Sequence, residues 1–312
     1  HPRYSEAAPR METPWPLPAL STLAAPHRPK IPSLRRTVRR GIAAYLILAF
    51  GIAWALWIPL WLLWIPASRG VAPLAFIAGA FAPAIAAAIV RLVVTRDGFA
   101  DAALAVNLRR AWPYYLFAGL WPFLVLAGIP ALSFVLGGAV GALSLPPEAL
   151  PGLLDAPRYG ALLLNALILT PLFFGEEFGW RGYLQIRLFG DRPLLAAIST
   201  GAIWGVWQLP AVLAGYLPNQ HGLLSLVSIP VYMILFSIVL GWLRLRAESV
   251  WAPSLAHSAN TTIVPRLGAI LPVGSGYGDL FFLPAGLLFL GALGLLCIGI
   301  VAGGGLASRK RR

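Results

Sequence analysis

The 312-residue sequence is too apolar for a soluble protein, because 59% of its residues are hydrophobic, only 11% are charged and its mean hydropathy is +0.77. The net charge of +13 does not indicate a nucleic-acid partner, since the basic residues flank apolar stretches instead of forming a folded reading surface. The single cysteine, Cys297, excludes an intramolecular disulfide and a cysteine-rich zinc site. These properties indicate a polytopic membrane protein.

The chain opens with a basic, proline-rich segment, residues 1–40, which predicts a disordered cytoplasmic tail. Eight apolar stretches follow, and each is long enough to cross a bilayer core of about 30 Å as a helix. We place them at 41–65, 71–94, 112–140, 160–186, 193–214, 222–243, 250–270 and 281–302. The predicted fold is an all-α bundle of about eight transmembrane helices over 41–303, followed by a basic cytoplasmic tail at 304–312.

The distribution of basic residues predicts how this bundle lies in the membrane. With both termini in the cytoplasm, 21 of the 24 Lys and Arg residues fall in cytoplasmic segments, leaving Arg69, Arg158 and Arg266 outside. Cytoplasmic segments of membrane proteins carry such an excess of positive charge. We therefore expect a multi-pass protein of the cell membrane with both termini cytoplasmic, which requires an even number of spans.

Two adjacent glutamates interrupt the stretch 160–186, where an ionisable group is costly and usually functional. Glu177 and Arg181 are four residues apart on one helix face, so we expect them to pair in a structural role. Glu176 points about 100° away and has no basic residue three or four positions along the helix. Glu176 is therefore the candidate general base, with a second structural carboxylate or an ion-pathway residue as the alternatives.

Two later stretches also carry polar side chains. In 250–270, His257, Asn260 and Thr261 form one polar stripe, which is typical either of a functional site or of internal packing hydrogen bonds. In 193–214, Trp204 precedes Gln208 by one helical turn. An amide alone would indicate only a contact between membrane helices.

Together, these segments resemble the CPBP family of intramembrane proteases, the CAAX prenyl protease, bacteriocin-processing or Abi group. The first motif of that family is two glutamates followed, after three residues, by an arginine, and it is matched by Glu176, Glu177 and Arg181. Its second motif is an aromatic residue followed four residues later by a histidine, which lines up with Trp204 and Gln208. The resemblance covers about 160–265.

The third motif of the family is a histidine with an asparagine four residues later. It lines up with His257, although Asn260 stands three residues on and Thr261 occupies the fourth position. The resemblance implies that Glu176 activates water for attack on a peptide carbonyl, and that Gln208 orients this water. It also implies that His257, with Asn260 or Thr261, steadies the oxyanion.

The implied partners are the lipid bilayer and a membrane-associated protein or peptide substrate, which in some relatives ends in a prenylated CAAX sequence. Zinc is disfavoured as a cofactor, although relatives are often labelled metalloproteases. A zinc ion here would have to use Glu176, His257 and the weak amide oxygen of Gln208, whereas catalytic zinc usually has three His or carboxylate ligands. The sequence leaves the oligomeric state open.

The glutamine at position 208 supports a second hypothesis. The family carries histidine there, and a glutamine cannot take up a proton. The alternative function is therefore a non-catalytic relative that binds peptides or scaffolds membrane partners. A secondary transporter ranks third, because its broken helices should repeat in two matching halves, and we find no such repeat.

Overall fold

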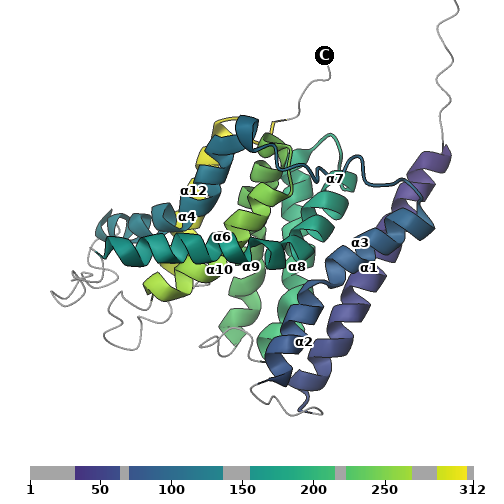
Figure 1. Ribbon diagram of the computed structural model, residues 1–312, viewed down its shortest axis with the longest axis horizontal. Coiled ribbons are helices and arrows are strands. Elements are labelled where there is room, and N and C mark those ends of the chain that lie inside the picture. The colour runs from purple at the N-terminus through teal and green to yellow at the C-terminus, as the bar shows by residue number, and fades with distance from the viewer. Residues whose placement is uncertain (1–31, 64–69, 136–154, 215–222, 269–286, 308–312) are drawn as a thin grey trace, which may run out of the picture.

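The computed structural model describes residues 32–63, 70–135, 155–214, 223–268 and 287–307, and the regular elements in these ranges are all helices (Figure 1). The α-helices are α1 (Pro32–Trp61), α2 (Val71–Ala80), α3 (Ala82–Ile89), α4 (Leu108–Val135), α6 (Ala156–Gly179), α7 (Gln185–Arg187), α8 (Pro193–Leu213), α9 (Leu223–Ala247), α10 (Trp251–Gly268) and α12 (Leu287–Ala302). Two π-helical turns, η2 (Val90–Val94) and η4 (Trp180–Leu184), follow α3 and α6.

The eight apolar stretches correspond to eight helical rods, because α2, α3 and η2 run on as one rod and α6, η4 and α7 as another. Six rods in the described ranges are long and apolar enough to cross a membrane: Arg36–Trp61, Val71–Val94, Leu108–Ile129, Ala156–Arg187, Pro193–Leu213 and Val227–Ala247. The apolar helix α12 is shorter than these six rods. The polar residues of the candidate site lower the mean hydropathy of α10. The predicted all-α, polytopic fold is confirmed.

The start of the first span was placed too late. We set the end of the N-terminal tail at residue 40, but α1 begins at Pro32, and residues 36–40 form an exposed, basic extension of the helix. Proline favours the first turn of a helix because its missing N–H has no intrahelical partner there. Apolar content marks only the part of a helix that meets lipid, so it missed this extension. Residues 1–31 and 308–312 of the two predicted tails lie outside the described residues.

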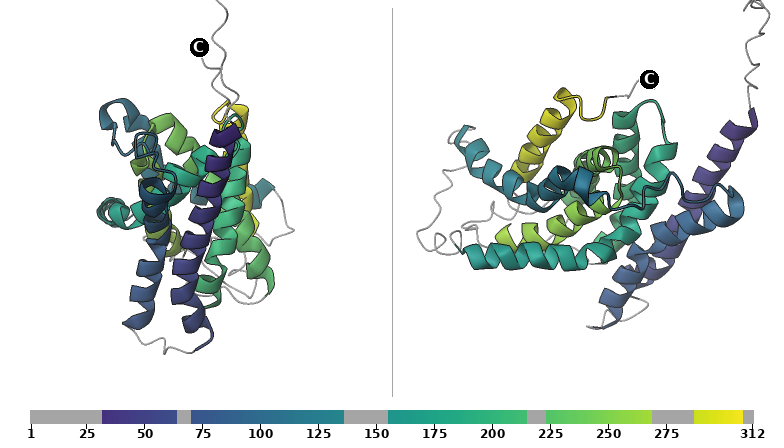
Figure 2. Two further views of the ribbon diagram at one scale, coloured as in Figure 1. Left: turned by 90° about the vertical axis from the view of Figure 1, so that its right-hand side faces the viewer. Right: turned by 45° about the horizontal axis from the view of Figure 1, so that its top comes forward.

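The helices α6 and α10 lie side by side across the middle of the bundle, with α8 and α9 packed against each other nearby (Figures 1 and 2). Glycines allow two of these rods to approach their neighbours closely. A Cβ atom at Gly179 of α6 would lie 2.3 Å from Pro83 of α3, and one at Gly201 of α8 would lie 2.6 Å from the Cα atom of Ile234 on α9. Small residues are the usual means of close helix packing in membranes, and here they bring α6 and α8 into place around the candidate site.

Candidate active site

The predicted pair on α6 is present. Oε1 of Glu177 accepts a hydrogen bond from Nη1 of Arg181 at 3.0 Å, and both side chains are fully buried. The same oxygen lies 2.9 Å from Nδ1 of His257 on α10. Glu177 therefore joins α6 to α10 as well as pairing with Arg181, a contact that helical spacing within α6 could not predict.

Glu176 turns toward α8, and its Oε2 accepts a hydrogen bond from the indole Nε1 of Trp204 at 2.8 Å. Glu176 remains 6% exposed, whereas Glu177 and Arg181 are 0% exposed. Glu176 therefore keeps a small exposed surface, which Glu177 lacks. The separate catalytic and structural roles of the two glutamates stay predictions.

Trp204 contacts both halves of the first motif. Its ring lies over the guanidinium of Arg181, with 4.5 Å between Cζ and the ring centroid, while its N–H holds Glu176. A guanidinium over an indole face is attracted by the ring quadrupole, most strongly where water is excluded. Trp204 is thus the structural link between the carboxylates of α6 and helix α8.

The imidazole of His257 is enclosed by aromatic rings. Its centroid lies 4.7 Å from Phe173, 5.2 Å from Trp204 and 5.5 Å from Phe236. An ionised Glu177 can only accept hydrogen bonds, so Nδ1 of His257 must carry the proton that lies between them. In the neutral imidazole, Nε2 is then left as a hydrogen-bond acceptor.

The remaining candidate residues have no direct bond to either glutamate among the described contacts. Gln208 lies one turn after Trp204 and is 7% exposed, and Asn260 is 8% exposed. The side-chain oxygens of both are buried without a donor in the described part of the chain. Thr261 is exposed, and its hydroxyl donates to the backbone carbonyl of His257 at 3.2 Å. Of the two proposed oxyanion donors, Asn260 is therefore better placed to face the interior.

These site residues all lie on the helices from α6 to α10. Residues 157–263 match the family model described as "Rce1-like: Type II CAAX prenyl endopeptidase Rce1-like". The α6–α10 core is therefore similar to the CAAX prenyl proteases of the CPBP family. This range agrees closely with the 160–265 over which the sequence motifs resemble that family. The chain matches none of the curated proteins with which it was compared.

The donor atoms of this CPBP-like core do not fit a catalytic zinc ion. Of the candidate ligands, Glu176 receives the Trp204 N–H, His257 has only Nε2 to offer, and Gln208 is a neutral amide. Across the described ranges, no group of three or more His, Cys, Asp or Glu side chains is arranged to hold a metal ion. The low expectation for zinc stays a prediction, which metal analysis of the purified protein would test.

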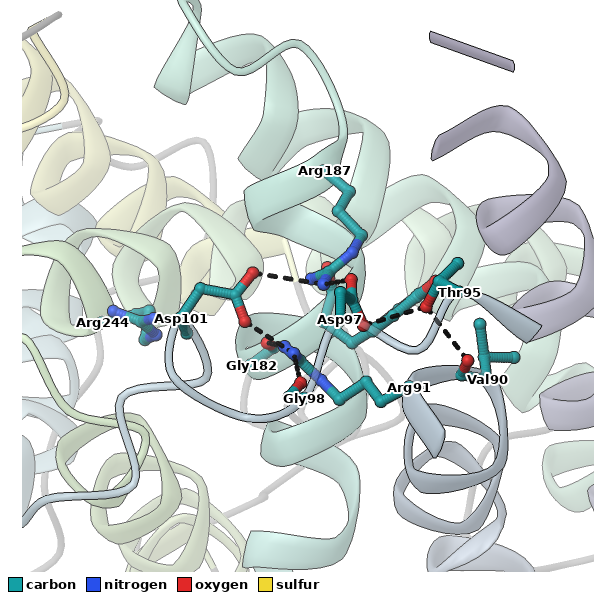
Figure 3. A network of polar contacts seen from close by, with 10 residues as sticks. Val90, Arg91, Thr95, Asp97, Gly98, Asp101, Gly182, Arg187 and Arg244 are labelled. Carbon is teal, nitrogen blue, oxygen red and sulfur yellow. Dashed lines mark hydrogen bonds and ion pairs between the residues drawn. The ribbon is translucent and has the colours of Figure 1, made fainter. Parts of the chain in front are cut away.

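A network of arginines and aspartates fixes the π-helical turn η4, which carries Arg181 of the CPBP motif (Figure 3). Arg91 is fully buried and donates from Nη2 to the carbonyl of Gly182 in η4 at 2.6 Å. Its Nη1 donates to Gly98 at 2.5 Å and to Asp101 at 2.6 Å, both in the loop after η2. Arg91 therefore fastens this loop to η4.

Arg187, at the end of α7, binds the same loop from the other side. Its Nη2 lies 2.5 Å from Asp97 and 3.1 Å from Asp101, and its Nη1 donates to the carbonyl of Tyr183 at 3.3 Å. Burial alone would raise the pKa of Asp97, but the hydrogen bonds from Arg187 and Thr95 outweigh that effect and lower the pKa. Sequence analysis used these arginines only to predict orientation and missed their role in holding η4.

Proposed function

We propose that this protein is an intramembrane endopeptidase that hydrolyses a peptide bond in a membrane-associated protein or peptide. The observation that carries the proposal is the placement of Glu176, a carboxylate in an apolar helix that keeps 6% of its surface exposed and is held by Trp204 at 2.8 Å. A general base needs access to water and a fixed direction; the bond from Trp204 fixes the direction, and we propose that the exposed surface of Glu176 admits the water. The similarity of the α6–α10 core to the CPBP family supports the same reaction class.

In the proposed reaction, the Trp204 N–H holds one oxygen of Glu176, and the other takes a proton from water. The hydroxide so formed attacks the peptide carbonyl carbon, and the protonated Glu176 then delivers the proton to the leaving nitrogen. Nε2 of His257 accepts a hydrogen bond from the attacking water, because Nδ1 is occupied by Glu177. The amide N–H of Asn260 donates to the oxyanion.

This scheme changes the role that the resemblance implies for His257. A neutral imidazole whose only N–H faces Glu177 has no hydrogen to donate to an oxyanion. It can instead orient water, which is the role that the resemblance implies for Gln208 at the position of the family histidine. His257 would thereby compensate in part for the glutamine at position 208.

The proposal is tested with internally quenched peptides that end in a CAAX sequence, one with a farnesylated cysteine and one without a lipid. The purified protein in lipid nanodiscs is compared with Glu176→Gln, which keeps the shape of the side chain but cannot act as a base. We expect cleavage of at least one peptide, with its site read by mass spectrometry, and a loss of about 10²-fold or more in Glu176→Gln. Undiminished cleavage by a folded Glu176→Gln variant would overturn the proposed role.

The second candidate function, a non-catalytic peptide-binding or scaffolding protein, is favoured by Gln208. In this case neither peptide is cleaved, and the wild-type protein and Glu176→Gln bind both peptides with equal affinity. Binding measured by fluorescence anisotropy, together with the cleavage assay, separates the two functions.

A further inference from the structure

Two adjoining hollows lie beside the C-terminal ends of α9 and α12; the first also borders the start of α8, and the second also borders α4. None of their lining residues belongs to the Glu176 site. Their volumes are about 460 and 550 Å³, within the usual range for small-molecule sites. The first is the more polar of the two, and its lining includes Arg244, Arg246 and Glu248 with glycine backbone. The second is mainly apolar and is lined by Tyr114, Trp242, Leu295, Leu296 and Ile300. Arg246 and Gly305 line both, so the two hollows form one amphipathic groove.

The shared wall of the groove is a glycine turn that ends α12. Gly304 has a φ of +69°, its N–H donates to Val301, and the N–H of Gly305 donates to Ile300. This is the Schellman pattern that closes many helices. Arg246 donates from Nη2 to the carbonyl of Gly304 at 2.8 Å and from Nε to that of Gly305 at 3.2 Å. The turn thus contributes no side chains and holds the guanidinium in place.

The polar end of the groove carries a net positive charge. Arg246 uses two of its five N–H donors on the glycine carbonyls. Arg244 is buried and donates to the backbone carbonyl of Asp101 at 2.9 Å. Glu248, the carboxylate that lines this end, lies 3.5 Å from Arg110 and also acts electrostatically on Arg244, so two arginines and one carboxylate leave one positive charge among the lining residues.

The apolar end borders the exposed apolar face of α12. Trp242 forms edge-to-face contacts with Tyr114 and Phe117, at 5.7 and 4.9 Å between centroids, and Leu295 is 59% exposed. Aromatic residues at helix ends are typical of the membrane interface. A ligand that fits this groove must be anionic at one end and apolar at the other.

We propose that the groove binds one anionic phospholipid. Its phosphate contacts the guanidinium of Arg246 and is attracted by the positive charge of Arg244. One acyl chain lies along Trp242 and Ile300 beside α12. The occupant is a lipid and not a free phosphate, because the positive end continues without a break into the apolar end. This inference is independent of proteolysis.

The test measures lipid retention by native mass spectrometry, with the full-length protein released from mixed micelles of phosphatidylglycerol and phosphatidylcholine. We expect phosphatidylglycerol to be retained, and Arg246→Gln to reduce its retention about fivefold, the effect of removing about 1 kcal/mol of electrostatic attraction. Arg39→Gln is the matched charge control, because Arg39 is exposed on α1 and does not line the groove.

A second pair of variants tests the apolar end without altering charge. A Cβ atom at Gly299, which lines the groove, or at Gly294, which does not, would meet nothing within 4 Å. Gly299→Leu should therefore fill the groove and displace the lipid, whereas Gly294→Leu should leave retention unchanged. This pair keeps the test valid if Arg246→Gln disturbs the glycine turn.

Three results would overturn the proposal. Equal losses in Arg246→Gln and Arg39→Gln would mean general attraction of the anionic lipid to the basic protein surface. Unchanged retention in Gly299→Leu would remove the acyl-chain site. Displacement of phosphatidylglycerol by millimolar glycerol 3-phosphate would show that the site takes a free phosphate.

Discussion

Nδ1 of His257 lies 2.9 Å from Oε1 of Glu177, and this contact joins the third motif of the chain to the first. The same oxygen accepts the Arg181 guanidinium, so one carboxylate positions both a positive charge and an imidazole. A carboxylate behind a histidine fixes its tautomer and its direction. Glu177 is therefore a positioning residue for His257 as well as the ion-pair partner of Arg181.

Glu177→Gln should reduce both folding stability and activity. Removing one partner from a buried ion pair leaves an uncompensated charge on Arg181, at a cost of about 3–5 kcal/mol. Glu176→Gln should abolish cleavage with little loss of stability, since its partner Trp204 is neutral. Thermal unfolding in detergent, measured beside the peptide assay, checks both variants. If Glu176→Gln unfolds at lower temperature and Glu177→Gln does not, the two roles are reversed.

Arg91→Gln should release the loop at residues 95–107 from η4. The buried Arg91 guanidinium satisfies the carbonyls of Gly182 and Gly98 and pairs with Asp101, so its loss leaves buried acceptors without donors. We expect faster proteolysis within this loop and a lower unfolding temperature. Arg96→Gln is the control, because Arg96 is an exposed residue of the same segment. Equal cleavage of the two variants would show that Arg91 does not hold the loop.

The Asp97–Arg187 pair should make a small, pH-dependent contribution to stability. Because the pKa of Asp97 is lowered in the folded protein, its contribution is present above the ordinary value near 3.8 and is lost as pH falls through the lower, folded value. The side chain is 36% exposed, so water screening should limit the effect to about 1 kcal/mol or less. Unfolding temperatures of wild type and Asp97→Asn should differ at pH 6 and converge at low pH. A gap that persists unchanged in acid would contradict this linkage.

The sequence predicted the parts of the fold that depend on residues close in the chain. Apolar length located the helices, and i,i+4 spacing identified the pairing of Glu177 with Arg181. It could not predict contacts between helices, such as Trp204 with Glu176 or His257 with Glu177, because no local period encodes which faces meet. For the same reason it missed Arg91, whose bonds to Gly182 depend on the packing of the η2 loop against η4.

The orientation of the bundle stays a prediction that rests on the 21-to-3 division of basic residues. In a Cys297→Ser background, single cysteines are placed near each end of the chain. They should react with a membrane-impermeant maleimide only after the cells are permeabilised. A cysteine at position 69, in a predicted external loop, should react in intact cells. Labelling of the C-terminal cysteine in intact cells would place that end outside and overturn the predicted topology.

Gln208→His should increase cleavage of a suitable reporter by at least about tenfold, provided that Glu176 and His257 are intact. The oxygen of Gln208 is buried without a donor in the described part of the chain, and its helix face is that of Trp204, which holds Glu176. An imidazole on this face could exchange protons with water, which an amide cannot do. The peptide assay described above measures the gain, and the same substitution in the Glu176→Gln background should give none, because the base is absent. Equal or lower activity in a folded Gln208→His variant would mean that His257 alone orients the water, or that this chain no longer catalyses hydrolysis; cleavage by the wild-type protein separates these two outcomes.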